Sequence, residues 1–169
     1  MDYFSNQWVV LGGIGVALVL CLYVAYRVCL KKRAPPARNP FDPDVTPEER
    51  ERRRVQKEKN QQSINTLPRI TKAELQTRKG MLVGICGHVF DVSSRAQAYR
   101  TGYSVFLGKD ASRGFATAST KSDTASDDIS GLEPKHMKAL REWYDFYMER
   151  YPLVAMLTDS LATVPAKTE

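Results

Sequence analysis

The chain has 169 residues and a formal net charge of +6, which leaves room for one domain with additional segments. Its three cysteines are too few and too scattered for a disulfide framework or a zinc site, and they indicate a reducing compartment. The basic excess suits an anionic membrane surface or an acidic protein partner. Nucleic acid is not expected as a partner, because no aromatic residue is interleaved with the basic clusters.

The N-terminal part of the chain is predicted to be a membrane anchor. Residues 8–26 form an uncharged run of 19 residues, and a helix needs about 20 apolar residues to cross a bilayer. The snorkelling side chain of Arg27 extends the predicted span to Leu30. Residues 1–7 contain Asp2 and no basic residue, which argues against a cleaved signal peptide or a mitochondrial transit peptide.

The residues around this span predict its orientation and its contacts. Four basic residues follow it: Lys31, Lys32, Arg33 and Arg38. The positive-inside rule then places the body of the protein in the cytosol, or in the matrix if the membrane is the mitochondrial inner one. Small residues within the span favour a homodimer or a larger complex, although glycine is also simply common in membrane helices. We therefore expect a single-pass protein of the endoplasmic reticulum or a mitochondrial membrane.

A linker and a polar helix follow the anchor. Residues 34–47 contain five prolines and are predicted to form an extended, stiff spacer. Thr46 as N-cap, Pro47 at the first helical position and Glu49 closing a capping box predict a helix that runs to about Asn60. This helix has no apolar face. It is therefore either a solvated spacer, which we favour, or a helix that lies along a partner.

The folded domain is predicted to be a small α+β unit between residues 66 and 159. A second capping box, from Thr71 to Glu74, opens a short helix, and two β-branched runs around Cys86 predict a β-hairpin. Asp110 is predicted to cap the start of another helix. Residues 119–131 are polar and acidic and predict a surface loop.

A long amphipathic helix is predicted from residue 134 to residue 150, ended by Pro152. Apolar and aromatic residues recur on one face at steps of three and four: Met137, Leu140, Tyr144, Tyr147 and Tyr151. Such a stripe is more often part of the core than a cofactor site. Trp143 lies beside it and is also expected in the core.

The most specific motif lies between Tyr103 and Ala116, which reads Tyr-Ser-Val-Phe-Leu-Gly-Lys-Asp-Ala-Ser-Arg-Gly-Phe-Ala. Together with Phe-Asp-Val after the predicted hairpin, and Trp143 followed by Arg150-Tyr151, it resembles the membrane-associated progesterone receptor family. The domain of that family is a variant of cytochrome b5. The resemblance implies a cytochrome b5-like heme/steroid-binding fold behind a single N-terminal transmembrane helix.

The resemblance and the residue patterns together predict five parts of the chain. They are an N-terminal tail (1–7), a transmembrane helix (8–30), a basic proline-rich linker with a polar helix (31–65), a cytochrome b5-like domain (66–159) and a C-terminal tail (160–169).

The resemblance also implies a haem b site. Tyr103 would be the axial phenolate ligand of the iron, and Tyr99 is similar to a second tyrosine of the haem-side loop. Arg150 and Tyr151 match a basic residue and a tyrosine that hydrogen-bond or pair near the haem. Tyrosinate is a hard anionic ligand that favours ferric iron. A neighbouring cation such as Arg150 would favour the phenolate over the phenol.

The chain departs from the family pattern in two places. The segment from Tyr99 to Tyr103 is two residues shorter than the family's Tyr-Gly-Pro-x-Gly-Pro-Tyr, and both prolines are gone. This loop shapes the edge of the haem site. Cys86 stands where the family usually has asparagine. It could bind iron or oxidise, but it is better explained as a tolerated turn residue on the side opposite Tyr103.

Three functions follow from these observations. The favoured one is a membrane-anchored haem-binding adaptor that also takes sterols and supports haem trafficking or partners of the cytochrome P450 type. The alternative is a haem-less structural accessory subunit of a membrane complex, such as a respiratory one. An electron carrier is the weakest, because the chain has only two histidines, His88 and His136, and no His-Pro-Gly-Gly motif. No enzyme active site is predicted, since hydrolase, phosphate-loop and nucleophile-elbow patterns are missing from the sequence.

Overall fold

The computed structural model describes residues 45–167. The predicted transmembrane helix (residues 8–30) and most of the linker lie outside the described residues. Among residues 45–167, none of the helices combines the length and the apolar character that crossing a membrane requires.

A four-stranded sheet organises the described part of the chain. Its strands are β1 (Arg69–Ile70), β2 (Leu82–Ile85), β3 (His88–Asp91) and β4 (Leu153–Leu157), in the spatial order β1-β4-β3-β2. The pairing of β2 with β3 is antiparallel and confirms the predicted hairpin. Strand β4 pairs antiparallel with β3 and parallel with β1. The sequence pattern did not predict β1 or β4.

The two-residue turn of the hairpin is formed by Cys86 and Gly87. Both have positive φ, at 52° and 74°, as a tight hairpin connection requires. The Cys86 amide donates to Ser112 Oγ at 2.7 Å, and the Gly87 amide donates to Asp110 Oδ2 at 2.8 Å. The turn is therefore held from outside the hairpin by residues at the start of helix α5 (Ser112–Ala116).

Four helices and three 3₁₀ turns surround the sheet. The helices of the predicted domain are α3 (Lys72–Thr77), α4 (Ala96–Thr101), α5 (Ser112–Ala116) and α6 (Pro134–Arg150). The 3₁₀ turns are η1 (Ser93–Arg95), η2 (Ser104–Phe106) and η3 (Ser122–Thr124). The full capping box of α3 and the bounds of the long helix α6 are confirmed.

The prediction of an acidic surface loop at residues 119–131 was wrong for one carboxylate. Asp127 is buried, at 7% exposure, and Lys72 Nζ donates to its Oδ2 at 2.8 Å. The sequence pattern missed this contact because the partner lies more than fifty residues away in the chain.

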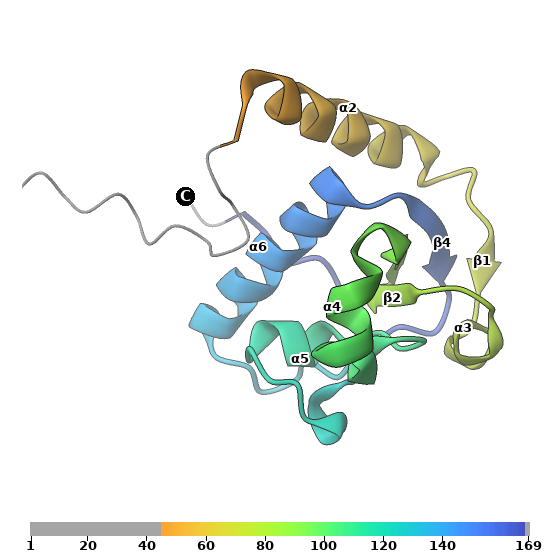
Figure 1. Ribbon diagram of the computed structural model, residues 1–169. Coiled ribbons are helices and arrows are strands. Elements are labelled where there is room, and N and C mark those ends of the chain that lie inside the picture. The colour runs from red at the N-terminus through yellow and green to blue at the C-terminus, as the bar shows by residue number, and fades with distance from the viewer. Residues whose placement is uncertain (1–44, 168–169) are drawn as a thin grey trace, which may run out of the picture. The chain divides into compact units, whose positions relative to one another are not determined.

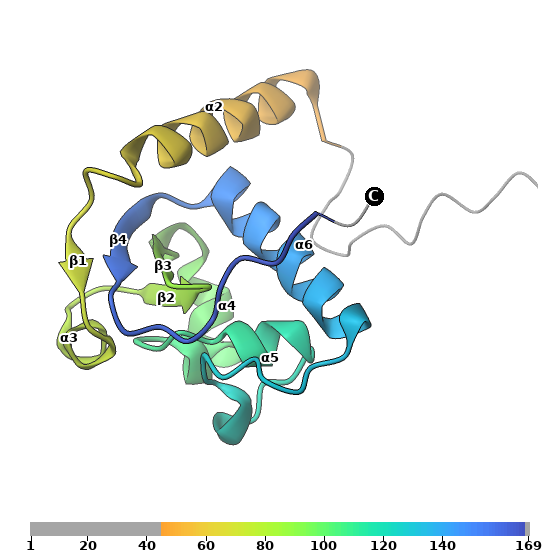
Figure 2. The same cartoon turned by 180° about the vertical axis from the view of Figure 1, so that it is seen from behind.

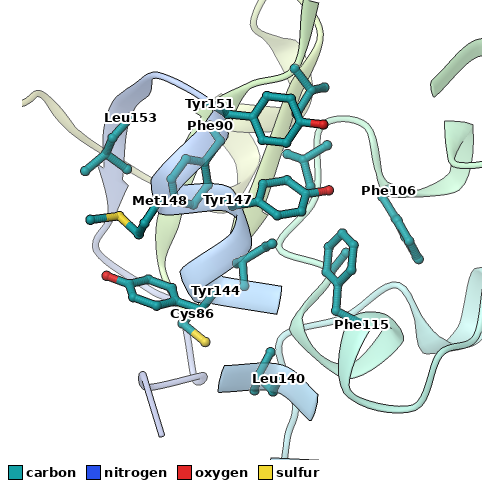
Figure 3. Packing of buried hydrophobic residues seen from close by; sticks show 14 of the residues in the cluster. Cys86, Phe90, Phe106, Phe115, Leu140, Tyr144, Tyr147, Met148, Tyr151 and Leu153 are labelled. Carbon is teal, nitrogen blue, oxygen red and sulfur yellow. The ribbon is translucent and has the colours of Figure 1, made fainter. Parts of the chain in front are cut away.

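Apolar residues pack on both faces of the sheet. The larger cluster joins the hairpin to α5 and α6, and includes Phe90, Phe115 and Leu140 (Figure 3). A smaller cluster around Leu75 packs α3 against the opposite face, on which Val89 is fully buried. The predicted core face of α6 is confirmed by Leu140, Tyr144 and Tyr147, which are buried together with Met148, whereas Met137 is half-buried.

The polar helix α2 (Pro47–Ser63) is not a solvated spacer, and that interpretation was wrong. It lies along the end of α6 that leads into β4 (Figure 1, Figure 2). Lys57 Nζ lies 3.3 Å from a carboxylate oxygen of Asp145 and 3.0 Å from one of Glu149. The contact is polar rather than apolar, so an apolar stripe could not reveal it. At its start, Glu49 donates its amide to Thr46 Oγ1, but its carboxylate pairs with Arg53.

Candidate functional site

Four tyrosines from two parts of the chain converge between α4 and α6. We call Tyr99, Tyr103, Tyr147 and Tyr151 the tyrosine cluster. The ring centroids of Tyr99 and Tyr103 lie 5.8 Å apart, and those of Tyr147 and Tyr151 lie 4.9 Å apart. The hydroxyls of Tyr99 and Tyr147 are hydrogen-bonded to each other and join the two halves of the cluster.

The short turn after α4 places Tyr103 beside Tyr99. The amides of Gly102 and Tyr103 both donate to the carbonyl of Ala98, at 2.9 Å and 3.1 Å. This closes α4 and turns the chain back over its own last turn. The Tyr103 carbonyl then accepts from the amide of Phe106 at 3.0 Å, which starts η2. The loop two residues shorter than the family pattern is therefore a hydrogen-bonded helix end.

Helix α6 supplies the other half of the cluster. Tyr147 lies in the last turn of α6, and Tyr151 directly follows the helix and packs its ring against that of Tyr147. Figure 3 shows the hydroxyls of these two tyrosines pointing the same way, while the hydroxyl of Tyr144 points to the opposite side. Tyr144 packs instead against His88, with ring centroids 5.0 Å apart. The tyrosine stripe of α6 thus divides into two site residues and one that belongs to the far side of the core.

The four members differ in their exposure. Tyr99, Tyr147 and Tyr151 are buried, at 5%, 1% and 6% exposure. Tyr103 is half-buried and packs against the edge of the core. Tyr103 is therefore the member of the cluster whose side chain remains partly open to solvent.

The electrostatics of the cluster favour neutral phenols at the buried positions. Burial raises the pKa values of both Tyr99 and Tyr147 well above their usual range. Burial also raises the pKa of Tyr151, although the positive charges of Arg95 and Arg150 oppose this shift. The cluster therefore combines uncharged hydroxyls, which can donate hydrogen bonds, with two nearby cations.

The structure brings the four sequence-predicted site residues into one region. Tyr99 and Tyr103 are ring neighbours, while Arg150 and Tyr151 follow one another at the end of α6. The guanidinium of Arg150 lies 3.9 Å from the ring centroid of Phe146, in a cation–π contact that orients it.

Sequence reasoning missed two residues of this region. Tyr147 was assigned to the core alone, although its position one turn before Tyr151 places both on the face that carries the motif residue. Arg95 belongs to no motif that the sequence analysis used, and its charge acts on Tyr151 only through the fold.

Two other types of ligand site receive little support within residues 45–167. The described residues contain no group of three or more histidine, cysteine, aspartate or glutamate side chains that could hold a metal ion. Cys86 is buried at 4% exposure, and burial, with a smaller contribution from Asp110, raises the pKa of its thiol to about 12. The thiolate is the form that binds metals, so this cysteine is a poor ligand.

Comparisons with known proteins add an independent line of observation. No family model matches the chain. It is 38% identical to human neuferricin over 98 residues, which are 53% of this chain and 37% of neuferricin. Over 78 residues, 45% of this chain, it is 37% identical to the Arabidopsis thaliana protein named "Probable steroid-binding protein 3", of which it covers 78%. A solved structure from Arabidopsis thaliana, described as having a cytochrome b5 like fold, is 32% identical, with a TM-score of 0.49 over 54% of this chain and 91% of that one.

The chain thus spans little more than a third of human neuferricin, but most of the shorter Arabidopsis relative. The chain covers 78% of that Arabidopsis protein at 37% identity, and this similarity leads to the same family as the Tyr103 motif. The chain belongs to the membrane-associated progesterone receptor family, whose domain is cytochrome b5-like.

Proposed function

We propose that this protein binds haem b through Tyr103 and acts as a membrane-anchored haem-binding adaptor rather than as an enzyme. The observation that carries the proposal is the asymmetry of the tyrosine cluster. Three of its phenols are buried, whereas Tyr103 is half-buried. An incoming cofactor would therefore meet Tyr103 first, with three further phenols behind or beside it.

The residues present fit a ferric haem. When bound, haem supplies an iron centre whose reduction potential is lowered by an anionic oxygen ligand. Tyr103 would provide that oxygen, and the neutral hydroxyls of Tyr99 and Tyr151 would donate hydrogen bonds beside it. Arg150 and Arg95 place positive charge in the same region, which suits both a phenolate and the carboxylates at a haem edge. Tyr147 holds Tyr99 in place through the hydroxyl pair.

The cellular setting belongs to the same proposal. We expect a single-pass protein of the endoplasmic reticulum or a mitochondrial membrane, with the domain facing the cytosol or the matrix. The relatives named as steroid-binding proteins support a test of sterols as additional ligands. Protein partners would be of the cytochrome P450 type or subunits of a membrane complex.

Hemin titration of the full-length chain in detergent tests the proposal. Tyr103→Phe should abolish or strongly weaken uptake and should remove the high-spin ferric spectrum expected of a tyrosinate ligand. Tyr144→Phe is the matched control, because it removes a hydroxyl from α6 that points away from the cluster (Figure 3). It should leave both the affinity and the spectrum close to wild type.

The possible outcomes separate the alternatives. Absence of stoichiometric uptake by the folded wild-type protein would refute haem binding and leave the haem-less accessory subunit. A low-spin spectrum typical of two histidine ligands would instead favour the electron carrier. An equal loss of hemin affinity in Tyr103→Phe and Tyr144→Phe would indicate that both variants disturb the fold, and not that Tyr103 ligates the iron.

A further inference from the structure

Asn60 is the buried residue of helix α2, and its polar side chain is fully engaged in hydrogen bonds. It is buried, at 2% exposure. Its Nδ2 donates to the carbonyls of Met148 and Tyr151, at 2.9 Å and 2.8 Å. Its Oδ1 accepts from the amide of Leu153 at 3.0 Å and from Gln56 Nε2 at 2.9 Å. A carboxamide has two donors and two acceptor positions, so its hydrogen-bonding capacity is used completely.

These partners are groups that the end of α6 leaves unpaired. The last carbonyls of a helix have no partner within the helix. Pro152 follows Tyr151 and has no N–H, so the helix cannot continue, and Tyr151 is extended with φ −122° and ψ 143°. Asn60 binds the two carbonyls and also the amide of Leu153, where β4 begins. Tyr151 closes α6 with its amide on the Tyr147 carbonyl, and Asn60 of α2 supplies further donors for the carbonyls of Met148 and Tyr151.

The capped turn carries two residues of the candidate site. Arg150 is the last residue of α6, and Tyr151 is the next. The Tyr151 ring packs against Tyr147, with centroids 4.9 Å apart. Because Asn60 binds the Tyr151 backbone directly, loss of its bonds would free the position of this ring relative to the rest of the cluster.

A second contact aligns α2 with α6 without touching the turn. Lys57 lies one turn before Asn60 on the same face of α2 and pairs with Asp145 and Glu149. Residues 57 and 60 therefore form one polar face that docks on α6. Lys57 fixes the helix along α6, and Asn60 fixes the turn that leaves it.

We propose that Asn60 is a positioning residue for the tyrosine cluster, holding Arg150 and Tyr151 in register with Tyr147 from a helix outside the predicted domain. This inference rests on the proposed function for one of its measurements, the affinity for hemin. Its other measurement, the order of the turn, does not depend on haem.

The experiment uses the full-length chain in detergent, with hemin titration and amide hydrogen exchange at Leu153. Asn60→Ala should weaken hemin affinity roughly tenfold, as loss of an outer hydrogen-bond partner does at metal sites, and should speed exchange at Leu153. Gln56→Ala is the matched control, since it removes only the bond inside α2. Asn60→Ser places a hydroxyl where the carboxamide was, so it retains part of the hydrogen-bonding capacity. It should lose less hemin affinity than Asn60→Ala, and it decides the question if Asn60→Ala does not fold.

A double-mutant cycle separates positioning from a general loss of stability. If Asn60 acts through the turn, the effect of Asn60→Ala on hemin affinity should shrink in a Tyr151→Phe background. An equal effect in both backgrounds, or unchanged affinity and unchanged Leu153 exchange in a folded Asn60 variant, would overturn the inference. If wild type takes up no hemin, the proposed function fails, while Leu153 exchange still shows whether Asn60 orders the turn.

Discussion

The hydroxyl pair of Tyr99 and Tyr147 is the point where the two halves of the tyrosine cluster meet. Both side chains are buried, so each hydroxyl depends on a protein partner rather than on bulk water. An unpaired buried polar group is more costly than a pair removed together. This asymmetry makes the pair testable without any ligand.

We predict that Tyr147→Phe lowers the free energy of unfolding by about 0.5–1.5 kcal/mol, because it removes the hydrogen bond between the buried hydroxyls of Tyr99 and Tyr147. In the double variant Tyr99→Phe, Tyr147→Phe, the free energy of unfolding should fall by less than the sum of the decreases in the two single variants. Urea denaturation at neutral pH measures all three. Strictly additive losses would show that the two hydroxyls do not depend on each other.

At this scale the motif around Tyr103 predicted more than composition or periodicity could. Together with the Arg150-Tyr151 match of the family resemblance, it predicted that Tyr99, Tyr103, Arg150 and Tyr151 belong to one site, although about fifty residues separate the two halves. It could not identify Tyr147, because a buried tyrosine on a helix stripe has the same pattern whether its hydroxyl meets the core or a site. Only the direction of the hydroxyl distinguishes Tyr147 from Tyr144 (Figure 3).

At the scale of elements, the free edge of β2 is closed by the segment that starts α5. The amide of Gly84 donates to the carbonyl of Lys109 at 2.8 Å, and the amide of Ala111 donates to the carbonyl of Gly84 at 2.9 Å. A Cβ on Gly84 would lie 2.8 Å from Asp110 Cα. Glycine is required at position 84 because the two backbones approach each other closely. The φ angle of Gly84 is not the reason.

Gly84→Ala should destabilise the domain by about 1–3 kcal/mol or more, because the obstructing atoms are backbone and cannot turn aside. Gly102→Ala is the control, since its Cβ would meet only the Ala98 carbonyl, at an ordinary 3.7 Å. Thermal unfolding of both variants beside wild type measures the difference. Equal melting temperatures for Gly84→Ala and wild type would contradict the close packing of β2 against residues 109–111.

Each element that was predicted correctly carries a recognisable pattern within its own short stretch of sequence. The hairpin has a two-residue turn between β-branched runs, and α3 has a full capping box. Strand β4 (Leu153–Leu157) was missed because its five residues are all apolar and show no strand-like alternation of apolar and polar side chains. Helix α2 was found, but its role was wrong, since Asn60 and Lys57 dock through polar groups that the apolar pattern does not count.

At the scale of the whole described unit, residues distant in sequence are tied together by buried carboxylates. Asp110 accepts from the amide of Gly87 and from Ser160 Oγ, both at 2.8 Å. It thereby connects the hairpin turn to the segment after β4. Such contacts span many residues, so no local pattern could predict that residues 160–162 pack on the domain.

Asp127 makes the second of these ties. Its Oδ2 accepts from Lys72 Nζ at 2.8 Å and from the Leu161 amide at 2.7 Å, which joins α3, the acidic loop and the C-terminal segment. Burial opposes ionisation, but the bonds from Lys72 and from backbone amides outweigh it and hold the pKa of Asp127 below its ordinary value of 3.8. A carboxylate with a lowered folded-state pKa stabilises the protein above its unfolded-state pKa, and this stability is lost as the pH falls.

We therefore predict that wild-type stability decreases on acidification below about pH 4, and that Asp127→Asn reduces this dependence. The variant should also be less stable near neutral pH by about 1–3 kcal/mol, because Lys72 and the Leu161 amide lose a charged acceptor. Urea unfolding between pH 3 and pH 7 tests both parts. Asp123→Asn is the control, since it removes the same charge from an exposed position in η3. If both variants followed the same pH profile, net charge and not the tie between Lys72, Asp127 and Leu161 would govern acid stability.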